Sequence, residues 1–205
     1  MTQALPKLVT FEEFVKWKPD GGGYELHDGV IVEMPQPLGK HEEVLGFIAF
    51  ELTAECKRLN FPYFIPKLAL VKPLEQECGY SPDVLILNRP NLVNEPLWEK
   101  ESTVVQADSI PLVVEVVSTN WRDDYFTKLG KYEEIGIPEY WIVDYLALGG
   151  RKFIGNPKQL TISVYSLVEG EYLLNQFRGD DRIGSPTFPE LTLTAQQIFQ
   201  GAGSV

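Results

Sequence analysis

An almost unbroken apolar run at residues 112–117 contains one charged side chain, Glu115. A strand that is apolar at nearly every position is typical of the centre of a sheet covered on both faces. A carboxylate buried in such a strand is costly unless a metal ion or a basic side chain lies beside it. The run therefore predicts a layered core with a charged site inside it. A buried salt bridge is the purely structural alternative.

The elements around this run follow the order helix, three strands, helix, strand. Apolar residues at helical spacing indicate the first helix, and Gly136 followed by Pro138 marks the end of the second. The expected bounds are 41–59 for the first helix, 63–71, 80–87 and 111–118 for the strands, 123–135 for the second helix and 139–144 for the last strand. A strand, a helix and a strand in succession favour a crossover connection, and with it a mixed sheet.

Both ends of the chain carry a predicted β-hairpin. After a short helix at residues 11–18, the sequence alternates around Asp28-Gly29, a dipeptide favoured in tight hairpin turns. A second hairpin is expected around Glu169-Gly170. We expect an α/β (α+β) fold in one domain over residues 1–205, with the first hairpin at 24–34, the core at about 41–145 and a C-terminal hairpin and helix at 160–200.

The net charge of the chain is −11, from 18 basic and 29 acidic residues. Such a charge opposes tight nonspecific binding to a polyanion, because nucleic-acid binders usually present a basic face. An enzyme that grips a short stretch of substrate needs only a local basic patch, and a divalent metal adds positive charge at the site. The charge therefore leaves nuclease chemistry open.

Several other classes of protein are disfavoured. No apolar run approaches the ~20 residues of a membrane-spanning helix, and residues 1–10 lack the pattern of a signal peptide. We therefore expect a cytoplasmic protein with no membrane partner. Two histidines and two scattered cysteines argue against a zinc site. A glycine-rich phosphate loop and the motifs of hydrolase triads are absent from the sequence.

Asp83 is the second candidate site residue, because it opens the apolar run at residues 84–87. Beside Pro82, an aspartate that caps a turn is the structural alternative. Asp83 and Glu115 are expected on neighbouring strands, where two convergent carboxylates would offer the hard oxygen ligands that Mg²⁺ prefers. Their pairing favours a metal site.

Lys128 is the third candidate. Tyr125, Leu129 and Tyr132 define the stripe of the second helix that should face the sheet. On a wheel at 100° per residue, Lys128 lies about 60° from the centre of that stripe and Lys131 about 120° away. Lys128 is therefore expected to reach inward. An ordinary pair with Asp124, four residues earlier, is the alternative.

A second tier of candidates is supported less directly. His41 begins the apolar stripe of the first long helix, and Glu42 follows it. Glu25 shares one face of the first hairpin with His27, and we interpret both as supporting residues. The second-tier residues are His41, Glu42, Glu25, Asp124 and Tyr132.

These motifs together resemble the Uma-two family of bacterial endonucleases, within the PD-(D/E)XK, or restriction-endonuclease-like, superfamily. The residues that carry the resemblance are YELHDG at 24–29, His41, Ser81-Pro82-Asp83, LVVEVVS at 112–118, Asp124, Lys128, Tyr132 and GIPEYWIVD at 136–144. The resemblance implies a restriction-endonuclease-like core. It also implies that Asp83, Glu115 and the backbone carbonyl of Val116 hold Mg²⁺ or Mn²⁺.

One position departs from the superfamily pattern. A lysine usually follows the second acid by two residues, and here that position is Val117. The resemblance suggests that a helix lysine replaces it, and Lys128 is the one that the helix geometry favours. The catalytic residues expected on this basis are Asp83, Glu115 and Lys128.

The expected function is that of a Mg²⁺-dependent endodeoxyribonuclease that hydrolyses phosphodiester bonds, with DNA as its partner. The alternative is an inactive nuclease-fold protein that acts as a binding or regulatory module. The acidic charge and Val117 favour the module, whereas the two acids and Lys128 favour the enzyme. A homodimer would supply two sites for cutting a duplex, although no sequence feature requires one.

Overall fold

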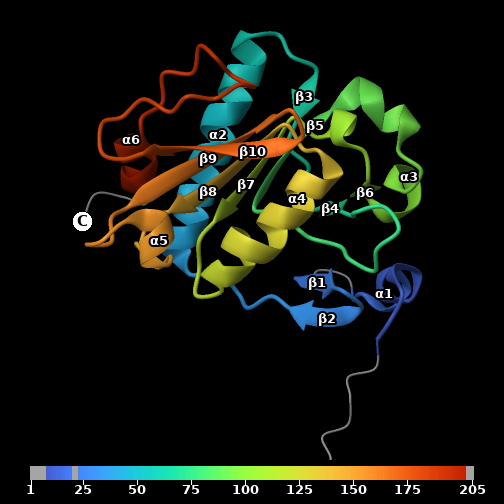
Figure 1. Ribbon diagram of the computed structural model, residues 1–205. Coiled ribbons are helices and arrows are strands. Elements are labelled where there is room, and N and C mark those ends of the chain that lie inside the picture. The colour runs from blue at the N-terminus through green and yellow to red at the C-terminus, as the bar shows by residue number, and fades with distance from the viewer. Residues whose placement is uncertain (1–7, 20–22, 202–205) are drawn as a thin grey trace, which may run out of the picture.

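The computed structural model describes residues 8–19 and 23–201, so residues 1–7 of the segment examined for a signal peptide lie outside the described residues. Its centre is a mixed sheet of six strands in the order β10-β9-β8-β7-β5-β3 (Figure 1). The strands are β3 (Tyr63–Phe64), β5 (Val84–Asn88), β7 (Leu112–Val116), β8 (Glu139–Asp144), β9 (Thr161–Val168) and β10 (Glu171–Phe177). β7 and β8 are parallel and the other neighbours antiparallel, which confirms the mixed sheet.

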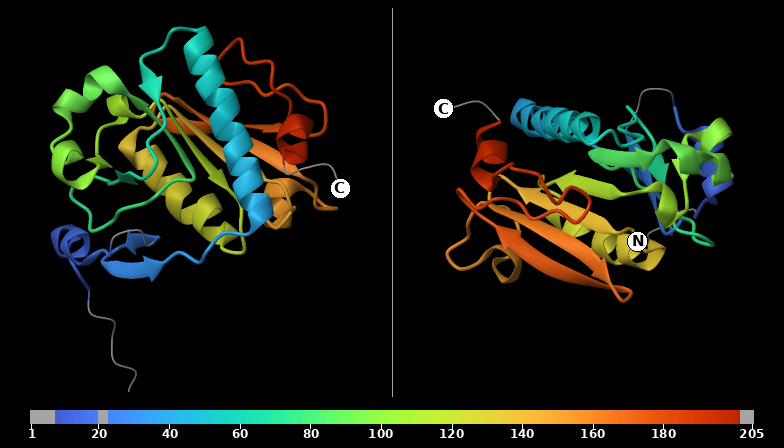
Figure 2. Two further views of the ribbon diagram at one scale, coloured as in Figure 1. Left: turned by 180° about the vertical axis from the view of Figure 1, so that it is seen from behind. Right: turned by 90° about the horizontal axis from the view of Figure 1, so that it is seen from above.

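Helices cover both faces of this sheet (Figure 2). Alternate residues of a strand point to opposite faces, so Val114 and Val116 of β7 pack in the core beneath α2 (Gly39–Arg58). Val113 and Val117 pack in the other core, with the helix that follows β7. Glu115 shares the face of Val113 and Val117, and this parity aims its carboxylate at that second helix.

The second helix is not a regular α-helix at its start. Residues Asp123–Lys128 form a π-helix, η3, which continues as α4 (Leu129–Ile135) and ends at Gly136 with φ +88°. The wider π turn changes which side chains face inward. Asp124, Lys128 and Tyr132 are buried, whereas Leu129 is only half-buried. The expected stripe is therefore displaced toward Lys128.

Two hairpins with the same turn chemistry have different places in the fold. The turn between β1 (Tyr24–His27) and β2 (Val30–Glu33) has positive φ at Asp28 (46°) and Gly29 (81°). Glu169 (52°) and Gly170 (88°) repeat this between β9 and β10, as a two-residue hairpin turn requires. β1 and β2 form a sheet of their own, whereas β9 pairs with β8 and extends the central sheet.

The strand expected at residues 63–71 was wrong as a single element. It is divided into β3 and β4 (Leu70–Val71), and β4 pairs in parallel with β6 (Thr103–Val104) outside the main sheet. Pro66 lies between them and has no N–H to donate to a strand ladder. For the same reason β5 begins at Val84, after Pro82, rather than at residue 80.

The remaining helices are short. α1 begins after Thr10, whose side chain accepts a hydrogen bond from the Glu13 N–H while the Glu13 carboxylate binds the Thr10 N–H. These helices are α1 (Phe11–Trp17), η1 (Arg89–Asn94), α3 (Trp98–Glu101), η2 (Ala107–Ser109), α5 (Arg151–Ile154) and α6 (Ala195–Gln200). Within residues 8–19 and 23–201, no helix has the length and apolar character needed to cross a membrane.

Candidate functional site

A cavity of about 390 Å³ lies beyond the carboxyl ends of β7 and β8. Carboxyl ends of adjacent parallel strands meet at one edge, where ligands of open α/β sheets commonly bind. The rim is largely apolar and includes Leu38, Leu146 and Leu148. The polar lining groups together the candidate residues from the sequence, namely His41, Asp83, Glu115, Asp124 and Lys128.

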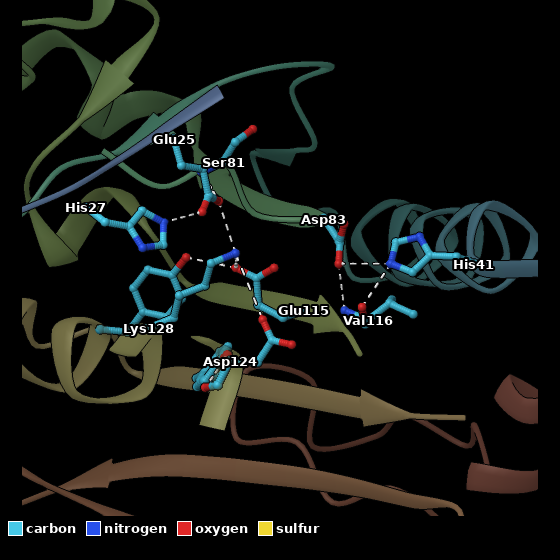
Figure 3. A network of polar contacts seen from close by, with 11 residues as sticks. Glu25, His27, His41, Ser81, Asp83, Glu115, Val116, Asp124 and Lys128 are labelled. Carbon is cyan, nitrogen blue, oxygen red and sulfur yellow. Dashed lines mark hydrogen bonds and ion pairs between the residues drawn. The ribbon is translucent and has the colours of Figure 1, made fainter. Parts of the chain in front are cut away.

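The Lys128 ammonium is surrounded by carboxylates from three different elements (Figure 3). Its Nζ lies 3.0 Å from Oε1 of Glu25 on β1 and 3.1 Å from Oε1 of Glu115 on β7. Oδ1 of Asp124, one turn earlier on the same helix, is 4.0 Å away. We call these four residues the lysine cluster. The expected pair with Asp124 is present, but it is the longest of the three contacts.

Neutral donors complete the lysine cluster. The Tyr132 hydroxyl donates to Oε1 of Glu115 at 2.9 Å. The backbone N–H of Ser81 donates to Oε1 of Glu25 at 3.0 Å, and the His27 ring lies 2.7 Å from its other oxygen. Glu25 was expected to be a supporting residue, and the structure places its carboxylate in direct contact with Lys128. The sequence clue to Ser81 was its place directly before Pro82-Asp83, and its backbone role was missed.

The pKa values show that acid exceeds base in the lysine cluster. Burial opposes the charged form of Lys128, but the surrounding carboxylates outweigh it and raise the pKa of Lys128 above its usual value. Burial also opposes ionisation of Glu25, yet Lys128 and the hydrogen bonds lower the pKa of Glu25 to about 2. Burial and neighbouring acids raise the pKa of Glu115 and bring that of Asp124 to about 7. One ammonium does not neutralise this many carboxylates.

Asp83 and His41 form the second half of the site, which we call the Asp83–His41 pair (Figure 3). Oδ2 of Asp83 accepts the Val116 N–H at 2.7 Å. Nε2 of His41 lies 2.9 Å from the Val116 carbonyl oxygen and 3.5 Å from Oδ2 of Asp83. Burial lowers the pKa of His41, but the hydrogen bond and charge of Asp83 outweigh burial and raise it overall.

Each of the two candidate metal ligands keeps one oxygen uncommitted. Among the described residues, the contacts of Glu115 all go to Oε1 and those of Asp83 all go to Oδ2. Oε2 of Glu115 and Oδ1 of Asp83 thus carry no protein hydrogen bond, and both residues line the cavity. Two free carboxylate oxygens amid excess negative charge fit a hard divalent cation.

The protein side chains do not by themselves complete a coordination shell. Within the described residues, no group of three or more His, Cys, Asp or Glu side chains is arranged to hold a metal. Mg²⁺ commonly keeps several water ligands and takes one or two carboxylates from the protein. Two acids and a backbone oxygen are compatible with an ion that keeps several of its water ligands.

Two sequence expectations fall outside the centre of the site. Glu42 has a side chain that is 52% exposed, 3.8 Å from Nδ1 of His41, and does not line the cavity. Val117 is fully buried beside the cavity, so the position where the superfamily pattern has a lysine carries an apolar wall.

Comparisons with known proteins agree with this architecture. The family model Uma2, described as "Putative restriction endonuclease", matches residues 11–196. A crystal structure described as a "putative nuclease belonging to DUF820" from Anabaena variabilis ATCC 29413 superposes with a TM-score of 0.72 at 18% sequence identity. That match covers 95% of this chain and 99% of the other, and confirms the fold. Among curated proteins, none matches the chain.

Proposed function

This chain belongs to the Uma2 family, described as "Putative restriction endonuclease". We propose that it hydrolyses phosphodiester bonds of nucleic acid with the help of a divalent metal ion. One observation carries the proposal. The uncommitted oxygens of Asp83 and Glu115 belong to side chains that line one cavity together with Lys128. Oxygen ligands can hold a metal ion that polarises a phosphoryl oxygen, and a fixed ammonium can stabilise the negative charge that develops during hydrolysis.

The metal would be Mg²⁺ or Mn²⁺, held by Asp83, Glu115 and the backbone carbonyl of Val116. When bound, such a cation supplies a polarised phosphoryl oxygen and a water of lowered pKa. Two neighbours of these ligands position them. The Val116 N–H fixes Oδ2 of Asp83 at 2.7 Å, and the Tyr132 hydroxyl fixes Oε1 of Glu115 at 2.9 Å. Each contact leaves the other oxygen of its carboxylate aimed elsewhere.

Lys128 would stabilise the charge that develops on the phosphoryl oxygens. Its side chain is 3% exposed, and the carboxylates around it raise its pKa, so it stays protonated. A cation held in place before reaction needs no reorganisation when charge appears, and this is the basis of electrostatic catalysis. Glu25 and Glu115, at 3.0 and 3.1 Å, restrain the ammonium from two sides.

His41 would act as a positioning residue. Its Nε2 lies near both the Val116 carbonyl and Asp83. A neutral or protonated ring can donate this N–H to the carbonyl, which retains a second lone pair. His41 therefore holds two proposed metal ligands in register without being one itself.

Cleavage assays test the proposal directly. The purified protein is incubated with single- and double-stranded DNA and RNA in Mg²⁺ or Mn²⁺, with DNA as the expected substrate. Asp83→Asn should lower the cleavage rate by more than the ~10- to 100-fold loss typical of mutating an outer-sphere partner. The matched control is Asp180→Asn, since Asp180 is exposed and makes no recorded ion pair in the described residues. Equal rates for both variants would assign the activity to another site or to a contaminant.

A binding module without catalysis is the second candidate. The observation that favours it is the engagement of Lys128 in two short ion pairs, with Val117 as an apolar wall. Calorimetric titration with Mg²⁺ separates the candidates. The enzyme should bind the ion, and Asp83→Asn and Glu115→Gln should each weaken binding. If both variants bind Mg²⁺ with the affinity of the wild-type protein, the enzyme is excluded and the binding module remains.

A further inference from the structure

An exposed group of aromatic and basic side chains lies next to the cavity. The Arg122 guanidinium is 4.5 Å from the centroid of the Trp121 ring. The Lys152 ammonium is 4.4 Å from the Phe126 ring and 4.6 Å from the Phe153 ring. We call these five residues the aromatic–basic patch. Each cation therefore lies over an aromatic face, in the geometry of a cation–π contact.

Tertiary packing holds the patch together. Trp121 precedes the π-helix η3 by two residues, Phe126 lies within it, and Phe153 belongs to α5. The Phe126 and Phe153 ring centroids are 5.2 Å apart, and those of Trp121 and Phe153 are 6.3 Å apart. A Cβ on Gly150 would lie 3.1 Å from the Trp121 ring, so the ring can approach the backbone this closely because residue 150 has no side chain.

The cations of the patch form no ion pair with an acidic side chain in residues 8–19 and 23–201. Arg122 and Lys152 are exposed, as is the neighbouring Arg151. No salt bridge between described residues includes any of the three. The Phe126 side chain is 48% exposed. In a chain of net charge −11, unpaired cations beside an exposed ring are complementary to a polyanion with aromatic bases.

The patch is continuous with the cavity. Asn120, Asp123 and Leu148 line the cavity. Asn120 and Asp123 flank Trp121 and Arg122 in the chain, and Leu148 lies three residues before Arg151, where α5 begins. A strand with a phosphate in the cavity would therefore have this surface beside it.

We propose that the aromatic–basic patch binds a single-stranded segment of the nucleic-acid substrate. A base stacks on the face of the Phe126 ring opposite Lys152, and the phosphates on either side pair with Arg122 and Lys152. Bases in an intact duplex are not available for such stacking, so the protein prefers single-stranded or frayed nucleic acid. The inference rests on the proposed function for the identity of the polymer, but binding at the patch does not require cleavage.

Binding is measured by fluorescence anisotropy with a labelled single-stranded oligodeoxynucleotide, in EDTA, on the Asp83→Asn background. Phe126→Ala should weaken binding about tenfold, the loss of one base–aromatic stack. Phe50→Ala is the matched control, because Phe50 is a phenylalanine on α2 that is 70% exposed, and it should leave affinity unchanged. A duplex of the same sequence should bind the unsubstituted patch more weakly.

Charge reversal tests the phosphate contacts. Arg122→Glu with Lys152→Glu should weaken binding more than tenfold and lower the salt dependence by about 1.4 in the logarithmic slope, the share of two phosphates on a single strand. Lys57→Glu with Lys67→Glu changes the net charge equally at two exposed lysines elsewhere, and should preserve the slope. Equal effects of the two double variants would overturn the proposal, as would equal affinities of Phe126→Ala and Phe50→Ala.

Two further readouts separate this inference from the proposed function. Cleavage of bis(4-nitrophenyl) phosphate, a diester too small to reach the patch, reports the cavity alone. If the protein cleaves that diester but the patch variants bind the oligonucleotide as well as their controls do, the binding role of the patch is wrong and the proposed nuclease function stands. Light scattering that shows a dimer dissociated by Phe126→Ala would assign the surface to a second copy of the chain, and would also overturn the proposal.

Discussion

The two halves of the site differ in how far the protein has closed them. In the lysine cluster, the side chains of Glu25, Glu115 and Lys128 are 1–3% exposed and bind one another. In the Asp83–His41 pair, Asp83 is 24% exposed. Glu115 belongs to the first half through Oε1, while its Oε2 makes no hydrogen bond with the described residues. The difference shows that one cavity combines a buried network of ion pairs with a carboxylate that is partly open to solvent.

The largest effect is expected from Lys128→Met. It leaves Glu25 and Glu115 buried without their cation, and breaking a buried pair in this way costs ~3–5 kcal/mol of unfolding free energy. Lys131→Met is the control on the same helix, because Lys131 is 22% exposed and 3.5 Å from an exposed Asp28. It should cost less than about 1 kcal/mol. Urea unfolding measures both variants. Equal losses of unfolding free energy would show that the buried ion pairs of Lys128 contribute no more than an exposed pair does.

Glu25→Gln should give the next effect. Burial raises the pKa of Glu25, but Lys128 and the hydrogen bonds outweigh it and hold that pKa at about 2, below the ordinary 4.5. A depressed carboxyl pKa stabilises the fold above about pH 4.5, and this contribution is lost as pH falls toward about 2. The substitution should thus cost on the order of 3 kcal/mol at neutral pH and nothing near pH 2. A cost that does not change with pH would place Glu25 outside the ion-pair network.

Asp124→Asn should act in the opposite direction. Burial, with Asp83 and Glu25, outweighs Lys128 and raises the pKa of Asp124 to about 7 from 3.8. A raised carboxyl pKa destabilises the fold as pH increases from about 4 to about 7. In EDTA at pH 8 the variant should be more stable than the wild-type protein, and this gain should shrink as pH falls toward about 4. Mg²⁺ should reduce that gain; an undiminished gain would show that the ion does not offset the acid excess.

The smallest effect is expected from Glu42→Gln, which marks the outer limit of the open half. Glu42 is 52% exposed and 3.8 Å from His41. Substitution should change the unfolding free energy by less than about 0.5 kcal/mol and leave the cleavage rate in Mg²⁺ nearly constant. A large loss of cleavage would move the boundary of the site outward to include this residue.

The local elements near the site were predictable because their signals are local. The alternation around Asp28-Gly29 gave the first hairpin, and the apolar stripe from His41 gave α2. The inward direction of Lys128 was also expected, although through a regular helical wheel. The structure reaches the same result through a π-helix, in which Asp124 is buried together with Lys128, while Tyr132 of α4 is buried as the stripe predicted. No periodicity of apolar residues distinguishes these two helices in advance.

The error at residues 63–71 has a local cause and a distant consequence. Pro66 interrupts the run, and because a proline has no N–H for a strand ladder, its position predicts two separate strands. The partner of β4, however, is Thr103–Val104, which lies some thirty residues later and shows only two strand residues. Such short parallel pairs depend on the packing of the whole chain.

By itself, the sequence determined that a carboxylate stands in a central strand and that it needs a partner, since an unpaired buried charge is too costly to keep. Only the tertiary structure decided what that partner would be. Glu25 comes from a hairpin outside the central sheet and Lys128 from a helix about a hundred residues later. The Lys128 ammonium lies 3.0 Å from Glu25 and 3.1 Å from Glu115. Strand parity and helix pitch act over a few residues, whereas the position of a hairpin against a sheet is set by the burial of whole surfaces.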